Sequence, residues 1–305
     1  MPPSSPAVLQ AHALTKRYRR AVAVDGLTFE VRPGRVTGFL GPNGAGKSTT
    51  LRMFLGLDRP TSGAATVGGL RLAETPHPAQ VVGAMLDARA LHPRRTARDH
   101  LAAVAAAGGV PRGRVAEALA RVGLAEAAHR PAGEFSLGMK QRLGIATALI
   151  GDPGVVIFDE PLNGLDPEGI RWARTLMRDL AAEGRTVLFS SHLMGEMELT
   201  ADHLVVIHRG RLLADQPLAE FIADRTTEHV RTRTPDRARL HVALSRAGLH
   251  ARDDGTGALV VTGATTDDVG HVAATASVEL SELTAVRDSL EDAFLAMTST
   301  RKDAA

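Results

Sequence analysis

Residues 41–48 read Gly-Pro-Asn-Gly-Ala-Gly-Lys-Ser and match the phosphate-binding pattern GxxxxGK[ST]. They follow an apolar run at 36–40 (VTGFL), typical of a buried strand, and precede a helical stretch that Gly56 ends. The glycines let successive N–H groups face one anion, and the helix that begins near Gly46 adds the positive end of its dipole. The sequence therefore predicts a nucleoside triphosphate site made by Gly41, Pro42, Asn43, Gly44, Ala45, Gly46, Lys47, Ser48 and Thr49.

The chemistry of such a site assigns a separate role to each polar side chain. Lys47 reaches the β- and γ-phosphates, and Ser48 offers its hydroxyl to Mg²⁺. A second apolar run, at 155–158 (VVIF), ends on Asp159 and Glu160. Asp159 would hold Mg²⁺ through water, and Glu160 would orient and activate the attacking water. Two solvated acids at a strand end are common, but their pairing with the glycine loop favours the functional interpretation.

Strand-like and helix-like patterns alternate along the first two thirds of the chain. Continuous apolar runs at 81–86, 155–158 and 186–190 are typical of strands that are buried on both faces of a parallel sheet. Helical patterns with start and stop signals cover 96–108, 114–122 and 167–183. This alternation predicts an α/β architecture with a mostly parallel sheet.

Further segments, in a fixed order, resemble the motifs of ABC-transporter ATPases. Residues 135–142 (FSLGMKQR) resemble the signature LSGGQ followed by QQR, and 163–167 (NGLDP) resemble the D-loop. Residues 190–192 (SSH) resemble the switch-histidine segment, and Tyr18 matches the aromatic residue that stacks on adenine. The resemblance covers about residues 8–217. The FSLGM version resembles that of bacterial ABC-2-type drug, antibiotic and bacteriocin-immunity exporters of the daunorubicin-resistance-like subgroup.

The resemblance implies a P-loop NTPase fold with an N-terminal β subdomain and a helical subdomain at about 88–134. It also implies that two copies sandwich two ATP molecules with Mg²⁺, and that Glu160, His192 and Lys47 carry the catalysis. Ser136 and Gly138 of one copy would touch the γ-phosphate held by Lys47 of the other. Asp166, in the D-loop, would belong to the same nucleotide site, and His192 would keep the water aligned with Glu160.

Four positions depart from the family pattern, and Met139 and Lys140, which replace glutamines of the signature segment, are two of them. Leu137 stands in the signature where a glycine is usual, so the contact with the γ-phosphate is expected to be looser. Asp87 occupies the Q-loop position, which holds glutamine, or glutamate in this subgroup. A carboxylate there can bind Mg²⁺, the water or the nucleotide, or it can be an ordinary polar loop residue. Both interpretations stay open.

The pattern changes after residue 223, which predicts an ATP-binding domain at 1–223 and a small domain at 224–305. Strands at 230–234, 249–253, 258–262 and 278–283 alternate with helices at 238–247, 266–276 and 288–297. The order βαββαβ is ferredoxin-like. The segment also resembles the small domain that is appended to daunorubicin-resistance-type exporter ATPases.

Composition excludes several other functions. Thirty-six basic residues against 34 acidic ones give a net charge of only +2, and aromatics make up 3%, so nucleic-acid binding is not expected. Cysteine is absent, and the longest mostly apolar stretch, at 101–110, is far short of a membrane span. The start of the chain has no signal-peptide pattern. Together with these absences, the resemblance to ABC-transporter ATPases implies a peripheral protein at the cytoplasmic face of the membrane.

The leading hypothesis is an ATPase subunit that powers export of a drug, antibiotic, peptide or lipid through a separately encoded ABC-2-type permease. Export through a partner is expected because this chain has no span of its own. The alternatives are an ATP-switched regulator with weak hydrolysis, and a ribosome-associated ABC protein without a permease. Proteins of that last kind typically carry two nucleotide sites or a long coiled coil, and this sequence has one phosphate loop and no sustained heptads.

Overall fold

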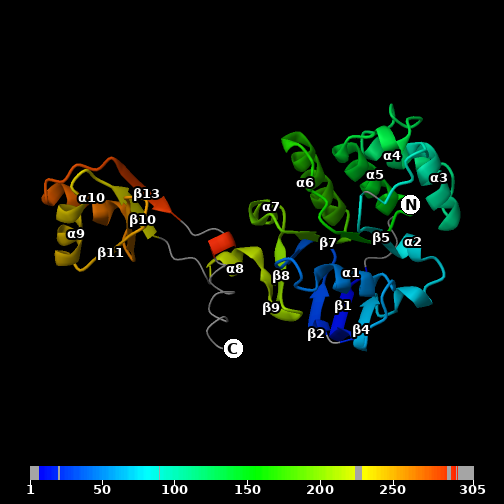
Figure 1. Cartoon of the computed structure of the whole chain (residues 1–305), viewed down its shortest axis with the longest axis horizontal. Helices are drawn as coiled ribbons and strands as arrows, with labels where there is room; N and C mark the ends of the chain where they lie inside the picture. Colours follow the sequence, from blue (N-terminus) through cyan, green and yellow to red (C-terminus); the bar gives the residue numbers. More distant parts are fainter. Residues whose placement is uncertain are drawn as a thin grey trace. The chain divides into compact units, whose positions relative to one another are not determined.

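The computed structural model describes residues 7–19, 21–88, 90–223, 229–286, 290–292 and 294. The chain divides into two compact units, Met1–Leu218 and Ala219–Ala305, shown in Figure 1. The boundary expected from the sequence, between residues 223 and 224, lies at the end of α8 (Leu218–Ala223). Each unit has its own hydrophobic core, described separately below.

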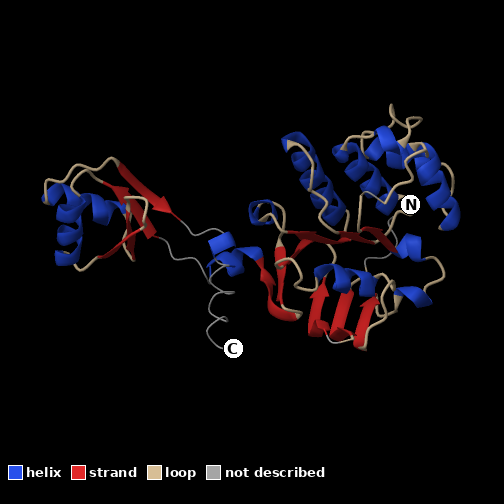
Figure 2. Cartoon of the chain, viewed as in Figure 1, coloured by secondary structure: helices blue, strands red, loops and turns tan. Residues whose placement is uncertain are grey.

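A six-stranded sheet forms the centre of the larger unit (Figure 2). Its order is β5-β6-β7-β3-β8-β9, and all neighbours are parallel except β9, which runs antiparallel to β8. Every residue of β3, β6 and β7 is buried, as the continuous apolar runs predict. The strands are β3 (Val36–Leu40), β5 (Val82–Met85), β6 (Val155–Phe158), β7 (Thr186–Ser191), β8 (His203–His208) and β9 (Arg211–Pro217).

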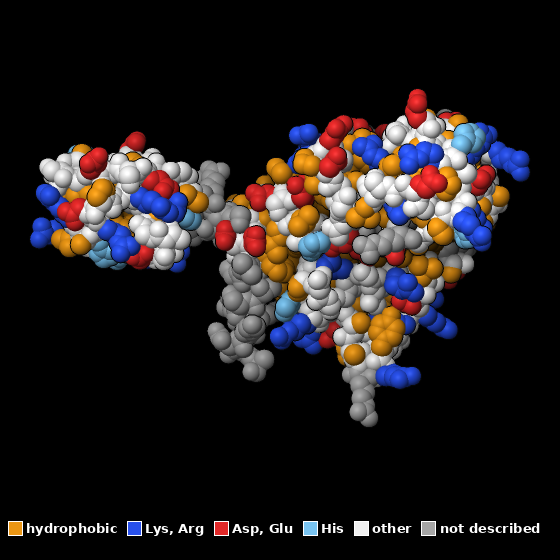
Figure 3. Space-filling view, turned by 45° about the horizontal axis from the view of Figure 1, so that its top comes forward, with side chains coloured by type: hydrophobic (Ala, Val, Ile, Leu, Met, Phe, Trp, Pro, Cys, Tyr) orange, Lys and Arg blue, Asp and Glu red, His pale blue; other side chains and the backbone are white. Residues whose placement is uncertain are grey.

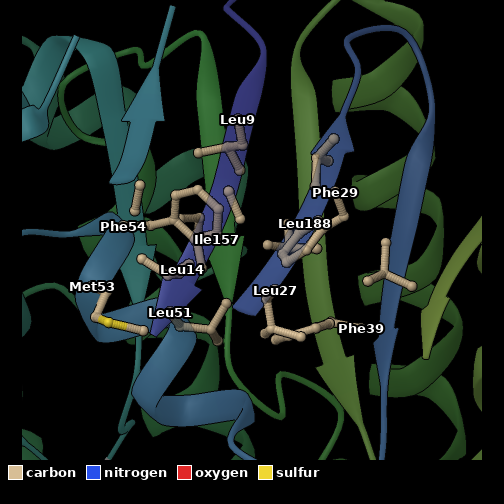
Figure 4. Close-up of a cluster of buried hydrophobic side chains, with 14 of the residues drawn as sticks. Leu9, Leu14, Leu27, Phe29, Phe39, Leu51, Met53, Phe54, Ile157 and Leu188 are labelled. Atoms are coloured by element: carbon tan, nitrogen blue, oxygen red, sulfur yellow. The ribbon is translucent and has the colours of Figure 1, made fainter. Parts of the chain in front are cut away.

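A second, antiparallel sheet is the N-terminal β subdomain, in the order β2-β1-β4. Its strands are β1 (Leu9–Tyr18), β2 (Ala21–Val31) and β4 (Ser62–Val67), and it packs with α1 (Lys47–Phe54) against the central sheet. Phe29 of β2 lies 5.6 Å from Phe39 and 5.9 Å from Phe54, measured between ring centroids. Figure 4 shows these rings among the leucines that join the two sheets and α1. This core fixes the start of α1 at the end of β3.

The longer helices lie on the other side of the central sheet, as Figure 1 shows. Thr96 caps α3, as predicted, because its side chain accepts a hydrogen bond from the N–H of Asp99. The signature helix α5 begins at Leu137, because Ser136 caps it through the N–H of Met139. Besides α1, this unit contains the described helices α2 (Pro78–Val81), α3 (Ala97–Ala107), α4 (Arg114–Arg121), α5 (Leu137–Leu149), α6 (Pro167–Ala182) and α7 (Met194–Glu198), with 3₁₀ turns at Leu72–Glu74 and Ala132–Glu134.

The smaller unit has the predicted ferredoxin-like order of elements. Its sheet order, β11-β12-β10-β13, is antiparallel throughout, and α9 and α10 supply the helical part of its core. The elements are β10 (His229–Arg233), α9 (Arg237–Arg246), β11 (His250–Asp253), β12 (Leu259–Thr262), α10 (Thr266–Thr275) and β13 (Glu282–Val286).

The last strand differs from the prediction of 278–283. Val278 is instead tied to the C-terminal cap of α10, because its N–H donates to the carbonyl of Ala273 (2.9 Å) after Ser277 turns into the left-handed region (φ 53°). Pairing begins only at Glu282, opposite Arg233. The predicted final helix at 288–297 lies mostly outside the described residues.

The surface carries both signs of charge. On the face shown in Figure 3, basic and acidic side chains are interspersed over each unit. Among the described residues, no helix combines the length and the apolar composition that a bilayer crossing requires.

Candidate active site

The loop between β3 and α1 needs glycine for two reasons. Gly44 and Gly46 have positive φ angles of 79° and 105°. A Cβ on Gly46 would lie 2.5 Å from the carbonyl oxygen of Ala23, so a side chain there would collide with backbone. Gly46 is also the N-cap of α1, so the loop carries the chain directly into the positive end of that helix. This is a cradle shaped for an anion.

Lys47 is the buried cation of this loop, with 7% of its surface exposed. Its Nζ donates to the carbonyl oxygens of Gly41 and of Pro42, the latter at 3.4 Å. Burial lowers the pKa of its ammonium, whereas the carboxylates of Glu160 and Asp159 act in the opposite direction. A phosphate chain in the cradle would give this desolvated charge an anionic partner.

A cavity of about 490 Å³ opens over the loop. Nucleotide-sized ligands occupy pockets in this size range. Most of the residues predicted for the nucleotide line it, so the structure brings them together. The lining residues are Tyr18, Ala23, Pro42, Asn43, Gly44, Gly46, Lys47, Ser48, Thr49, Leu86, Asp159 and Glu160.

Ser48 and Asp159 form the part of the cavity that fits a divalent cation. The Oγ of Ser48 donates to Oδ2 of Asp159 at 2.9 Å. Both are hard oxygen ligands, and Mg²⁺ is usually bound by one or two carboxylates together with substrate phosphates and waters. Within the described residues, no group of three or more His, Asp or Glu side chains could hold a metal ion on its own. The donor set therefore suits Mg²⁺ that arrives with a phosphate ligand.

Glu160 and His192 meet at the carboxyl ends of β6 and β7. Nδ1 of His192 lies 2.8 Å from Oε2 of Glu160, and the N–H of His192 donates to the same oxygen at 3.4 Å. The backbone of Glu160 adopts φ 53°, in the left-handed region, which costs a non-glycine residue roughly 1–2 kcal/mol. A strained backbone at the end of a buried strand is typical of a functional position.

Two residues that were not predicted from the sequence hold Asp159 and Glu160 in place. Ser190, at the end of β7, donates through Oγ to Oδ1 of Asp159 (2.5 Å) and accepts the N–H of Glu160 (2.9 Å). Gln141 of α5 donates through Nε2 to the carbonyl of Asn163 (2.8 Å) and, at 3.5 Å, to that of Glu160. The available signal for Ser190 was its place two residues before His192, at the end of an apolar run that predicts a buried strand.

Tyr18 lines the cavity with 43% of its surface exposed, which leaves a ring face free for stacking. Its hydroxyl donates to Oδ2 of Asp58 at 2.9 Å, and Nζ of Lys16 lies 4.9 Å from the ring centroid. Nε of Arg52 donates to the same carboxylate at 2.8 Å, and this hydrogen bond lowers the pKa of Asp58. Arg52 and Asp58 therefore set the position of the tyrosine, and neither residue was predicted.

Seven predicted site residues do not line this cavity. Gly41 and Ala45 belong to the loop itself, and His192 contacts Glu160. The other four are Asp87, Ser136, Gly138 and Asp166. Asp87 lines a neighbouring cavity of about 180 Å³ together with Leu137 and Gln141, and Asp159 and Glu160 form the wall that the two cavities share. Ser136, Gly138 and Asp166 line neither of these two described cavities. Asp166 instead caps α6, since its Oδ1 accepts the N–H of Gly169 at 2.8 Å. Within one copy of the chain, the phosphate loop and the acids therefore share a cavity that the signature residues do not line.

Comparison with known proteins shows the family of this chain. A family model described as ABC transporter matches residues 24–163, and a model of a domain of unknown function matches 228–291. An uncharacterized ABC transporter ATP-binding protein of Bacillus subtilis is 34% identical over 97% of each chain. A bacitracin transport ATP-binding protein of Bacillus licheniformis is 41% identical over 69% of this chain and 70% of its own. The solved structure of an ATP binding subunit of an ABC transporter matches with a TM-score of 0.65 and 31% identity, covering 71% of this chain and 92% of that one.

Proposed function

Because this chain belongs to the family of ABC transporter ATP-binding proteins, which hydrolyse ATP to drive transport, we propose that it powers an exporter with a separate ABC-2-type permease. The observation that carries the catalytic part is the convergence of Lys47, Ser48 and the Asp159–Glu160 pair on one cavity. The exporter part is supported by the similarity to a bacitracin transport protein. The cargo class is a drug, antibiotic, peptide or lipid.

Each side chain has a distinct role in this proposal. Lys47 and the N–H groups of the loop bind the phosphates, and Tyr18 stacks on the base. Ser48 and Asp159 hold Mg²⁺, which neutralises charge on the β- and γ-phosphates when it is bound. Glu160 orients and deprotonates the attacking water, and His192 fixes the carboxylate of Glu160 through the 2.8 Å contact.

The proposal includes a dimer that closes around ATP. Ser136 and Gly138 lie outside the cavity of their own chain, which supports a γ-phosphate contact made by a second copy. Ser136 is well suited to that task because it begins α5, where N–H groups and a hydroxyl meet an anion. Hydrolysis would then open the dimer and transmit force to the permease, with the chain at the cytoplasmic face of the membrane.

Glu160→Gln tests the mechanism directly. This variant should bind ATP, lose steady-state phosphate release by about 10²-fold or more as expected for removal of a general base, and run as a dimer in size-exclusion chromatography with Mg²⁺ and ATP. Lys47→Ala is the control, since it should lose ATP binding and stay monomeric. If Glu160→Gln stays monomeric at saturating ATP, the sandwich is wrong.

Two further outcomes separate the alternatives. Phosphate release that is the same in wild type and in Glu160→Gln, with ATP still bound, would favour a regulator with weak hydrolysis. Co-purification of a polytopic permease with this chain from native membranes would support the transporter assignment, whereas recovery on ribosomes would contradict it.

A further inference from the structure

We infer that Ser190 is a positioning residue that sets the orientation of both acids in the active site, an inference that rests on the proposed role of Glu160. The residue is fully buried at the end of β7, next to β6 in the central sheet. Its hydroxyl donates to Oδ1 of Asp159 and accepts the N–H of Glu160. One side chain therefore holds a carboxylate of one acid and the backbone of the next.

Asp159 divides its two oxygens between the two serines. Oδ1 accepts from Ser190 at 2.5 Å, and Oδ2 accepts from Ser48 at 2.9 Å. The bond to Ser190 fixes the rotation of the carboxylate so that Oδ2 faces the phosphate loop. Without this hydrogen bond, the carboxylate of Asp159 would keep only its hydrogen bond to Ser48, and both of those groups would also have to bind the metal ion.

Glu160 depends on Ser190 through its backbone. A non-glycine residue at φ 53° needs neighbours that hold its peptide groups in place. Ser190 holds the N–H at 2.9 Å, whereas the carbonyl accepts from the N–H of Asn163 at 3.3 Å and from Nε2 of Gln141 at 3.5 Å. Loss of the Ser190 hydroxyl removes the shortest of these three restraints. It would let the backbone relax toward ordinary φ values and turn the carboxylate away from the water that it activates.

The test compares variants of the full chain at two adjacent serines. Ser190→Ala removes the hydroxyl, and Ser190→Thr keeps it. Ser191→Ala is the matched control, because Ser191 is equally buried on the same strand and its described hydrogen bond is with the N–H of Leu193 (3.0 Å). We expect Ser190→Ala to lower kcat for ATP about 10- to 100-fold with KM changed less than twofold, a range that misplacement of a catalytic group produces. Ser190→Thr should recover most of this loss, and Ser191→Ala should stay within threefold of wild type.

Two more measurements separate positioning from a structural or metal effect. The kcat of Ser190→Ala should stay low at saturating Mg²⁺, and full recovery there would show that only metal affinity had changed and overturn the inference. In a Glu160→Gln background at saturating Mg²⁺, Ser190→Ala should cost less than threefold in residual turnover, because one of the two acids that it orients is gone and the metal ion holds the other in place. If Ser190→Ala does not fold, the isosteric Ser190→Cys takes its place with the same expectations.

The outcomes keep this inference apart from the proposed function. If Glu160→Gln is inactive while Ser190→Ala matches wild type, the role of Ser190 is wrong and that of Glu160 stands. If Glu160→Gln turns over like wild type, the proposed base is wrong. A loss in Ser190→Ala that persists unchanged in that background would then show that Ser190 does not act through Glu160.

Discussion

Leu137 occupies the space that a side chain on Gly164 would need. A Cβ on Gly164 would lie 2.0 Å from Cδ2 and 2.6 Å from Cγ of Leu137. The leucine stands at the signature position where the family usually has glycine, and it is 39% exposed above the D-loop. Gly164 also has φ 75°, so both its backbone and its neighbour select glycine. The leucine that replaces the usual glycine of the signature therefore fits because the D-loop has no side chain at position 164.

Gly164→Ala should destabilise the larger unit by about 2–4 kcal/mol, from the left-handed backbone together with overpacking against Leu137. Leu137→Ala removes Cγ and Cδ2 and leaves only a Cβ contact of 3.6 Å, so the double variant should recover about 1 kcal/mol or more. Urea unfolding followed by fluorescence measures this, because the single tryptophan, Trp172, lies on α6 of the larger unit. Strict additivity of the two changes would contradict the contact.

Tyr18 offers a prediction about nucleotide affinity. Tyr18→Ala should weaken ATP binding about tenfold, since stacking of a base on an aromatic ring contributes roughly 1–3 kcal/mol. Tyr18→Phe keeps the ring and loses only the hydrogen bond to Asp58, so it should weaken binding less than threefold. Calorimetric titration in the Glu160→Gln background avoids hydrolysis. Equal losses in the two variants would show that the hydroxyl, and not the ring, matters.

The parts of the site that the sequence predicted are those set by local pattern. A glycine loop after a buried strand, and acids at the end of another, meet because carboxyl ends of parallel strands lie at one edge of the sheet. The β3 and β6 strands have the predicted bounds, and the loop and acids share one cavity. The comparisons confirm the family that the order of motifs indicates.

The parts that the sequence did not predict depend on side chains far apart in the chain. Asp58 reaches Tyr18 across 40 positions, and Ser190 reaches Asp159 across 31. No periodicity links such pairs, because each contact depends on how loops or neighbouring strands align in three dimensions. The start of β13 was misplaced for a related reason, since an apolar residue after a helix, Val278, can pack without joining the sheet.

The two units suggest a prediction about autonomy. The smaller unit has its own core, which includes Val230, Leu240 and Val261. We therefore propose that a chain truncated after residue 223 folds and binds ATP within threefold of the full chain. Circular dichroism and calorimetric titration would check this. A truncated chain that aggregates or fails to bind nucleotide would show that the larger unit depends on the smaller one.

Arg185 forms a buried ion pair that predicts how stability depends on pH. Its side chain is 5% exposed, and Nη2 lies 2.8 Å from Oδ1 of Asp152 and from Oε2 of Glu183. Burial alone would raise the pKa of Asp152, but the hydrogen bond and charge of Arg185 outweigh it, so the pKa is lowered. A carboxyl group whose pKa is lower in the folded than in the unfolded state stabilises the fold at pH values above its unfolded-state pKa of about 3.9. This stabilisation is lost as the pH falls through the folded-state pKa.

Arg185→Met should therefore lower the free energy of unfolding by about 2–3 kcal/mol near pH 7. This loss is smaller than for a fully buried ion pair, because Asp152 keeps some exposure. The difference in free energy of unfolding between wild type and variant should become smaller as pH falls from about 5 to 3, since protonated Asp152 no longer forms an ion pair with the arginine. Urea unfolding monitored through Trp172 gives both values. Arg178→Met is the control, because Arg178 donates to a carbonyl, that of Leu199 (2.6 Å), so its effect should not change with pH over this range. If the difference in free energy of unfolding between wild type and Arg185→Met stays constant from pH 7 to pH 3, the ion pair does not lower the pKa of Asp152.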